Sequence, residues 1–205
     1  MPNYKLTYFD ISGGRGEPVR IAFHAAGIPF EDNRVSGAEF GAMRDSTRFK
    51  YLPQLEIDGT VVTQSNAMCR YVGRLAGLYP EDDLQALYCD EVLEVVEDDS
   101  HRIGRTFGLE GDAMKQAREK LVDGWTTPFL RGLSELLARG GGKYFADQRL
   151  TVADLKALME VRWISSGMLD YVPKDLVRKV APDIADHVAR IAEEPVVKAW
   201  YASRK

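Results

Sequence analysis

The fold is decided by the stretch Tyr4-Lys5-Leu6-Thr7-Tyr8-Phe9 and the segment after it, Asp10-Ile11-Ser12-Gly13-Gly14-Arg15-Gly16-Glu17-Pro18. The first six residues alternate large apolar side chains with others, which predicts a half-buried strand. Three glycines and a serine disfavour regular structure in the next segment, and Pro18 suits the first turn of a helix. The predicted order is strand, turn and helix, with Tyr8 at the end of the strand.

Tyr8 is the first candidate functional residue. In an open α/β sheet, ligands bind in the crevice outside the carboxyl ends of the strands. A phenol at that place can donate a hydrogen bond to a bound anion. The alternative is a half-buried strand tyrosine whose hydroxyl faces water, and this stretch alone leaves both interpretations open.

Composition narrows the class of protein. The chain has 205 residues and a formal net charge of -4, which argues against a dedicated nucleic-acid binder. Cys69 and Cys89 lack CxxC spacing, and three scattered histidines give no metal-ligand pattern, so we expect no metal. No apolar run approaches the length of a membrane span. These features favour a soluble cytoplasmic protein that does not bind membranes.

The pattern up to residue 80 is β-α-β followed by β-β-α. A helix over 18–26 ends at Gly27, and a strand follows over 30–35, which implies parallel pairing through a right-handed crossover. The polar segment 36–48 is a poor helix or a loop containing one. Asp58-Gly59 predicts a tight hairpin between two strands, and a helix follows with Ser65 as its N-cap.

The composition changes near residue 80 from mixed α/β to all-helical. Apolar residues at helical spacing predict helices over 84–107 and 112–139. Thr151 and Asp154 form a capping-box pattern that opens a helix through about Ser165, and two shorter helices follow near 174–190 and 195–202. We therefore expect two domains, 1–80 and 81–205.

The motifs in this order resemble a cytosolic glutathione transferase, and they are most similar to the sigma class. They are Tyr8, Leu52-Pro53, Gln64-Ser65 and the Thr151–Asp154 box, and the resemblance covers essentially the whole chain. It implies an α/β plus all-α protein. A thioredoxin-like glutathione-binding domain would precede an all-helical domain that forms the electrophile pocket and part of a dimer interface.

The resemblance also implies roles for individual residues. Tyr8 would be catalytic: its hydroxyl would stabilise the glutathione thiolate, which attacks a soft, apolar electrophile. Pro53 matches the family's cis-proline, and the backbone of Leu52 would pair with the cysteinyl group. Ser65, at a helix N-terminus, and Gln64 would bind the γ-glutamyl carboxylate.

Further implied glutathione contacts are less regular. Arg15 matches an arginine that supports the site, with a solvated turn arginine as the alternative. Asp98 would reach glutathione from the partner subunit of a homodimer, although Glu97 and Asp99 leave this register uncertain by one. Three positions depart from the sigma pattern or replace its usual residues: Phe40, Arg44 and Tyr51.

The electrophile pocket is expected between the Tyr8–Gly14 segment and residues near 102–107, with Phe9, Gly14, Ile103, Gly104, Thr106 and Phe107 as candidates. The sequence does not name the substrate. A glutathione-dependent isomerase or peroxidase, similar to a prostaglandin isomerase, would use the same thiolate. A non-catalytic, crystallin-like ligand-binding relative is a further alternative from another class.

Overall fold

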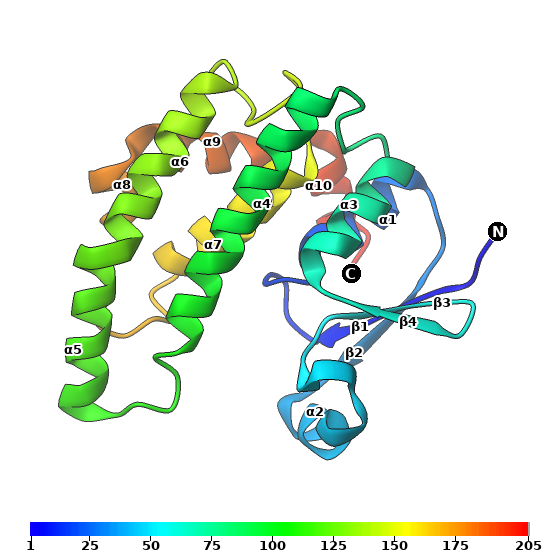
Figure 1. The fold of residues 1–205 in the computed structure, drawn as a ribbon, viewed down its shortest axis with the longest axis horizontal. Helices are drawn as coiled ribbons and strands as arrows, with labels where there is room; N and C mark the ends of the chain where they lie inside the picture. Colours follow the sequence, from blue (N-terminus) through cyan, green and yellow to red (C-terminus); the bar gives the residue numbers. More distant parts are fainter. Residues whose placement is uncertain (205) are drawn as a thin grey trace. The chain divides into compact units, whose positions relative to one another are not determined.

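The computed structural model describes residues 1–204 and forms two compact units (Figure 1). The first unit contains Met1–Tyr79 and the segment from Val196 onward, and the second contains Pro80–Pro195. The first unit thus combines the beginning of the chain with its end. Within the described residues, no helix is long and apolar enough to span a membrane.

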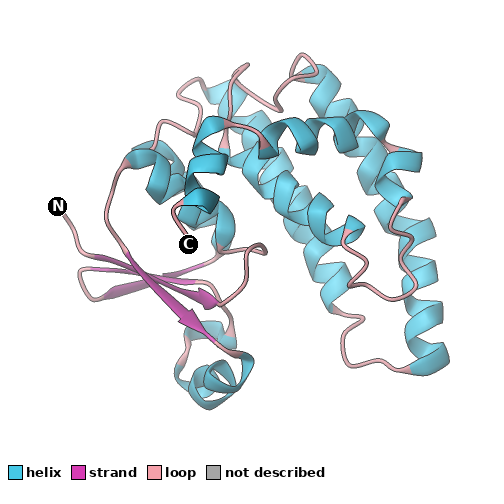
Figure 2. Ribbon diagram, turned by 180° about the vertical axis from the view of Figure 1, so that it is seen from behind, coloured by secondary structure: helices cyan, strands magenta, loops and turns pink. Residues whose placement is uncertain are grey.

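The first unit is built on one four-stranded sheet (Figure 2). The strand order is β2-β1-β3-β4, with β1 parallel to β2 and antiparallel to β3, and with β4 antiparallel to β3. Their bounds are β1 Tyr4–Phe9, β2 Glu31–Val35, β3 Gln54–Ile57 and β4 Thr60–Thr63. Asp58 and Gly59 both have positive φ, 47° and 84°, which confirms the predicted hairpin turn.

Three helices follow strands of this sheet in sequence: α1 Glu17–Ala26, α2 Gly37–Met43 and α3 Ser65–Leu75. Gly27 ends α1 in the left-handed conformation, as predicted. The segment 36–48 contains a real helix, because the Ser36 hydroxyl and the Glu39 carboxylate form a reciprocal capping box at the start of α2. Two 3-10 turns, Arg44–Ser46 and Arg48–Lys50, continue from it.

The final helix, α10 (Pro195–Ala202), differs from expectation because it does not belong wholly to the helical unit. Its Trp200 lies beside two aromatic rings of the first unit, with centroids 5.7 Å from His24 and 6.4 Å from Phe30. The indole Nε1 of Trp200 also donates a hydrogen bond to Glu17 at 2.8 Å. Through these contacts the end of α10 packs within the first unit, although in sequence the helix follows the helices of the second unit.

The second unit is all-helical, as expected. Its helices are α4 Asp83–Gly104, α5 Gly111–Leu121, α6 Thr127–Arg139, α7 Val152–Ser165, α8 Leu176–Val180 and α9 Pro182–Ala192. The predicted single helix over 112–139 is interrupted by a π-helical turn, Val122–Thr126, between α5 and α6. The predicted helix over 174–190 is split at Ala181, and Pro182 opens the second part.

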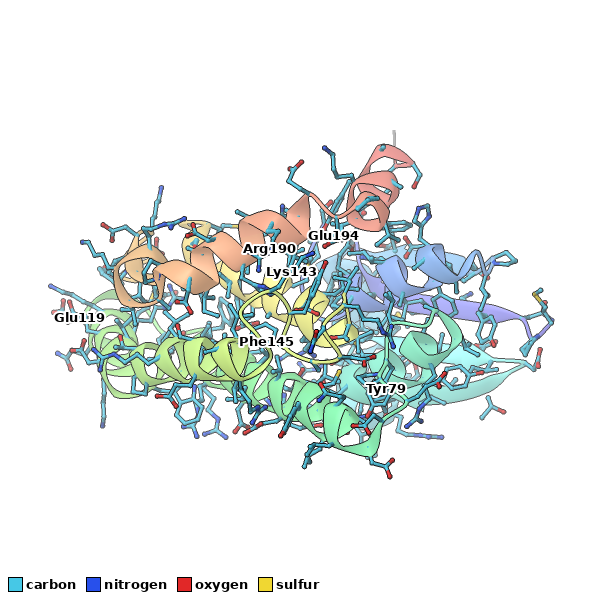
Figure 3. The ribbon with its side chains drawn as sticks, turned by 90° about the horizontal axis from the view of Figure 1, so that it is seen from above. Tyr79, Glu119, Lys143, Phe145, Arg190 and Glu194 are labelled. Atoms are coloured by element: carbon cyan, nitrogen blue, oxygen red, sulfur yellow. The ribbon has the colours of Figure 1, made fainter. Side chains whose placement is uncertain are left out.

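Helix α7 is the buried centre of the second unit. The Thr151–Asp154 capping box is present, and the fully buried Asp154 also accepts a hydrogen bond from the backbone N–H of Phe145. The Nε2 atom of the buried His187 lies 3.4 Å from the same carboxylate. Arg190 donates to the carbonyl of Lys143 at 2.8 Å and fixes the loop that enters α7 (Figure 3).

Candidate functional site

The strand register brings three of the proposed site segments to one end of the sheet. Thr7 of β1 pairs with Gln54 of β3, and Gln54 pairs with Thr63 of β4. The next residues beyond these pairs at that end are Tyr8, Pro53 and Gln64. Segments far apart in the sequence therefore meet where β1 and β4 end and β3 begins.

Tyr8 is held in a small apolar cluster at this end of the sheet. Its side chain is buried and packs with Val35 and Leu52, against which Phe9 and Phe40 also pack. The backbone N–H of Arg15 donates a hydrogen bond to the Tyr8 hydroxyl oxygen, with an N···O distance of 3.0 Å. A hydroxyl that accepts such a bond is polarised, which makes it a better donor of its own hydrogen.

Two glycines of the turn lie directly against the Tyr8 ring. A Cβ at Gly14 would lie 2.5 Å from the Tyr8 hydroxyl oxygen, and a Cβ at Gly16 would lie 2.5 Å from the ring carbon Cδ1. Gly14 also has a φ of +65°, which glycine adopts without strain. The glycines therefore allow the backbone to approach the ring closely enough for the Arg15 N–H to reach the hydroxyl.

A buried arginine fixes the end of β1. Arg20 of α1 donates to the carbonyl oxygens of Phe9 and Ile11, which flank Asp10, at 3.2 and 3.1 Å. The same guanidinium bonds the carboxylates of Glu17, at 3.1 Å, and Asp32, at 2.8 Å. The sequence analysis did not identify this network. The feature that could have indicated it is Arg20 itself, a charged residue within a largely apolar helical stretch.

The peptide bond between Leu52 and Pro53 is cis, as the resemblance implied. Leu52 is buried beside Tyr8, whereas the neighbouring Tyr51 is exposed. Phe40 packs edge-on against Phe9, with a centroid distance of 5.4 Å. Phe40 therefore contributes apolar packing near Tyr8 and has no polar side-chain atom to offer a ligand.

The start of α3 differs by one residue from the prediction. Ser65 is the first helical residue, and Gln64 occupies the N-cap position with φ 75° and ψ 108°. The Gln64 side chain makes no capping hydrogen bond, and the first turn of α3 lies at the positive end of the helix dipole. A non-glycine residue in so rare a backbone conformation is typical of a ligand-binding site.

The other predicted glutathione contacts are not brought into the Tyr8 cluster. Arg15 reaches Tyr8 through its backbone. Arg44 is exposed after the end of α2. On α4, Asp98 is exposed, whereas Asp99 is fully buried and Glu97 is bonded to Lys156 at 2.6 Å. Asp98 is therefore the member of this acidic run that is accessible for an outside partner.

The candidate pocket residues divide between the two units. Phe9 and Gly14 belong to the first unit, and 103–107 belong to the second. Ile103 is buried in the helical core, and Thr106 is buried with its hydroxyl bonded to the Ile103 carbonyl and to Arg118. Gly104 and Phe107 are exposed, and Phe107 stacks on Trp163, a residue that sequence analysis did not identify.

Comparison with known protein families covers both units. The model of "Glutathione S-transferase, N-terminal domain" matches residues 4–74, and that of "Glutathione S-transferase, C-terminal domain" matches residues 97–204.

Whole proteins match along their full length. Glutathione S-transferase 1 of Ascaris suum is 34% identical, and the hematopoietic prostaglandin D synthase of Gallus gallus is 31% identical; each match covers 100% of this chain and 98% of the relative. The solved structure of prostaglandin synthase D of Nilaparvata lugens superposes with a TM-score of 0.85 at 29% identity, over 100% of this chain and 99% of that one. These matches confirm the predicted fold class and the expectation of a glutathione transferase: the chain belongs to the glutathione S-transferase family.

Proposed function

We propose that Tyr8 activates glutathione by donating its hydroxyl hydrogen to the glutathione sulfur. A hydrogen bond to the charged form lowers the pKa of a thiol, so more thiolate is present at neutral pH. The observation that carries this proposal is the bond from the Arg15 N–H to the Tyr8 hydroxyl oxygen, which orients the phenol and strengthens it as a donor. The thiolate then adds to a soft electrophile, without a covalent enzyme intermediate.

The remainder of glutathione is assigned to the residues around this end of the sheet. The first turn of α3, with Ser65 and Gln64, suits the γ-glutamyl carboxylate, because the N-terminus of a helix is the positive end of its dipole. The backbone of Leu52 pairs with the cysteinyl group beside the cis-proline Pro53. Arg44 is assigned to the glycyl carboxylate. Phe40 and Tyr51 are the other predicted glutathione contacts, and neither side chain carries a charge.

A homodimer completes the proposed site. Asp98 is the exposed acid of its run, and we assign it to the glutathione amine of the partner subunit. The test uses Asp98→Asn, with Glu94→Gln as the matched control because Glu94 is another exposed acidic residue of α4. Asp98→Asn is expected to raise the KM for glutathione without changing the oligomeric state measured by light scattering. An unchanged KM for Asp98→Asn contradicts the assignment.

The candidates for contact with the second substrate are Phe9 and Gly14 within the first unit, and Gly104 and the exposed Phe107 within the second. Because Ile103 and Thr106 are buried, we assign them to supporting Gly104 and Phe107. A sigma-class enzyme of the cytoplasm that conjugates electrophiles is the proposal that agrees with all these assignments. A relative named as a prostaglandin D synthase and a solved structure named as a prostaglandin synthase D favour one alternative, a glutathione-dependent isomerase. Assays of electrophile conjugation and of prostaglandin D formation, run on the same protein, separate the two.

The decisive experiment is an ultraviolet titration of the bound glutathione thiolate. In the wild type, the bound thiol should ionise well below free glutathione, and Tyr8→Phe should lose most of this shift. The control is Tyr4→Phe, which removes another phenol from the same strand, one that is hydrogen-bonded to Tyr71. If glutathione binds and Tyr8→Phe ionises it as the wild type does, Tyr8 is not the activating group.

A further inference from the structure

The segment 12–17, which carries the Arg15 N–H, is bonded at both ends to the C-terminal segment. Glu17 follows Gly16 directly, and its Oε1 atom accepts hydrogen bonds from Trp200 Nε1 at 2.8 Å and from Arg204 Nη1 at 3.0 Å. The same Nη1 atom donates to the Ser12 hydroxyl at 3.1 Å. One guanidinium nitrogen therefore bridges the beginning and the end of this segment.

These bonds matter because Glu17 is buried as an ion. Glu17 and Arg20 both have 0% of their side chains exposed and form an ion pair through Glu17 Oε2. A buried ion pair is stable only when its remaining polar atoms are also hydrogen-bonded. For Glu17 Oε1, the C-terminal segment supplies both donors. Arg20 donates from the paired Nη1 to the Ile11 carbonyl as well, and from Nη2 to the Phe9 carbonyl at the end of β1.

We propose that Trp200 and Arg204 are positioning residues for Tyr8: by holding Ser12 and Glu17, they fix the turn whose Arg15 N–H orients the Tyr8 hydroxyl. Arg204 holds Ser12 and Glu17 by hydrogen bonds, and the short backbone between these two residues carries Arg15. The Arg15 N–H then bonds the Tyr8 hydroxyl. All of these residues lie within the first unit. The consequence for thiol ionisation rests on the function proposed above for Tyr8.

The variant that tests this is Arg204→Gln, which removes the charge that reaches Glu17. The Arg204 side chain is 22% exposed, so the loss leaves no large cavity. We expect the Arg15 amide hydrogen to exchange with solvent several-fold faster, and the pKa of bound glutathione to rise by about half a unit to one unit. Arg204→Lys keeps the charge and is expected to restore most of both properties.

A second variant and a control make the result specific. Trp200→Phe removes the Nε1 donor but keeps a ring beside His24 and Phe30, and it should change both readouts in the same direction. Arg178→Gln breaks a comparable arginine–carboxylate pair, with Asp186 at 2.6 Å in the second unit, and should change neither.

The two readouts separate the two proposals. If Arg15 exchange and thiol ionisation are both unchanged in Arg204→Gln and Trp200→Phe, the positioning role is wrong, whatever Tyr8→Phe shows. If Arg15 exchange accelerates but neither these variants nor Tyr8→Phe shifts the thiol pKa, the C-terminal segment holds the turn but the proposed role of Tyr8 fails. Faster exchange together with a raised thiol pKa, rescued by Arg204→Lys, supports both.

Discussion

Gly16→Ala is the substitution for which the structure makes the sharpest prediction. Gly16 has ordinary helical angles, φ −83° and ψ −26°, so alanine fits the backbone without strain. At an unhindered position of this kind, glycine to alanine stabilises a protein by roughly 0.4–1 kcal/mol, because the unfolded chain loses freedom. Here, however, the new Cβ would lie 2.5 Å from Tyr8 Cδ1 and 2.6 Å from Cγ.

The clash determines the size of the effect. Carbon atoms in contact lie about 3.5–4.0 Å apart, so the ring and the turn must separate by about 1 Å. Overpacking of this kind costs about 1–3 kcal/mol of stability. A similar movement at the hydroxyl breaks the 3.0 Å bond from Arg15 and misplaces the donor. A hydrogen bond to a charged group contributes about 1.5–3 kcal/mol, which corresponds to about one to two pKa units at the bound thiol.

The assay combines urea denaturation with the ultraviolet titration of bound glutathione. Gly132→Ala in α6 is the control, because a Cβ there meets no atom within 4 Å; it should be neutral or stabilising and leave the thiol unchanged. Gly16→Ala should be destabilised and should ionise glutathione at higher pH. A Gly16→Ala protein that is as stable as Gly132→Ala and ionises glutathione normally would refute the close-approach argument.

Three further predictions concern the second unit and the thiols. Burial raises the pKa of Asp99 from 3.8 to about 6, so between these values the native state holds a proton that the unfolded chain has lost, and the free energy of unfolding falls as pH rises. Asp99→Asn should remove this fall from the urea midpoints measured between pH 4 and 7. If the midpoints of the wild type and of Asp99→Asn change with pH in the same way, the prediction is wrong. Asp154→Ala leaves the buried N–H groups of Thr151 and Phe145 without their acceptor and should lower the free energy of unfolding by about 2 kcal/mol or more, whereas Asp154→Asn should lose less. Cys69 and Cys89 are buried, and burial raises the pKa of Cys89 to about 12. A thiol-specific disulfide reagent should therefore modify these two cysteines no faster than the protein unfolds. Rapid labelling of Cys69 or Cys89 in the native protein would contradict this prediction.

Local sequence signals predicted much of the fold. The alternation before Tyr8, the Asp58-Gly59 pair and the Thr151–Asp154 box each act within a few residues, and each has the expected structure. The Ser36–Glu39 capping box is also local, and it starts a helix in a segment whose polar composition predicts a poor helix or a loop. Such features need no knowledge of distant segments.

The remaining features depend on distant partners or on backbone angles. Full burial of Arg20 requires acceptors from the end of β1, from α1 and from β2 at once, which no local pattern encodes. The placement of α10 depends on the pairing of Trp200 with Glu17. Ser65 was predicted one position out of place because a positive φ at a glutamine cannot be read from its side chain. The resemblance, not the local pattern, implies a binding role for Gln64.

The contact between Trp200 and Glu17 has a consequence for biosynthesis, because the two residues are 183 positions apart. At about 5–20 residues per second, a ribosome adds the tryptophan roughly 10–40 seconds after the glutamate. Throughout that interval the Glu17 carboxylate of α1 lacks both of the donors that the C-terminal segment supplies. Synthesis of the first unit therefore starts at the N-terminus but is complete only when the C-terminal segment has been made. A nascent chain arrested before residue 200 would expose an incomplete first unit to chaperones and proteases.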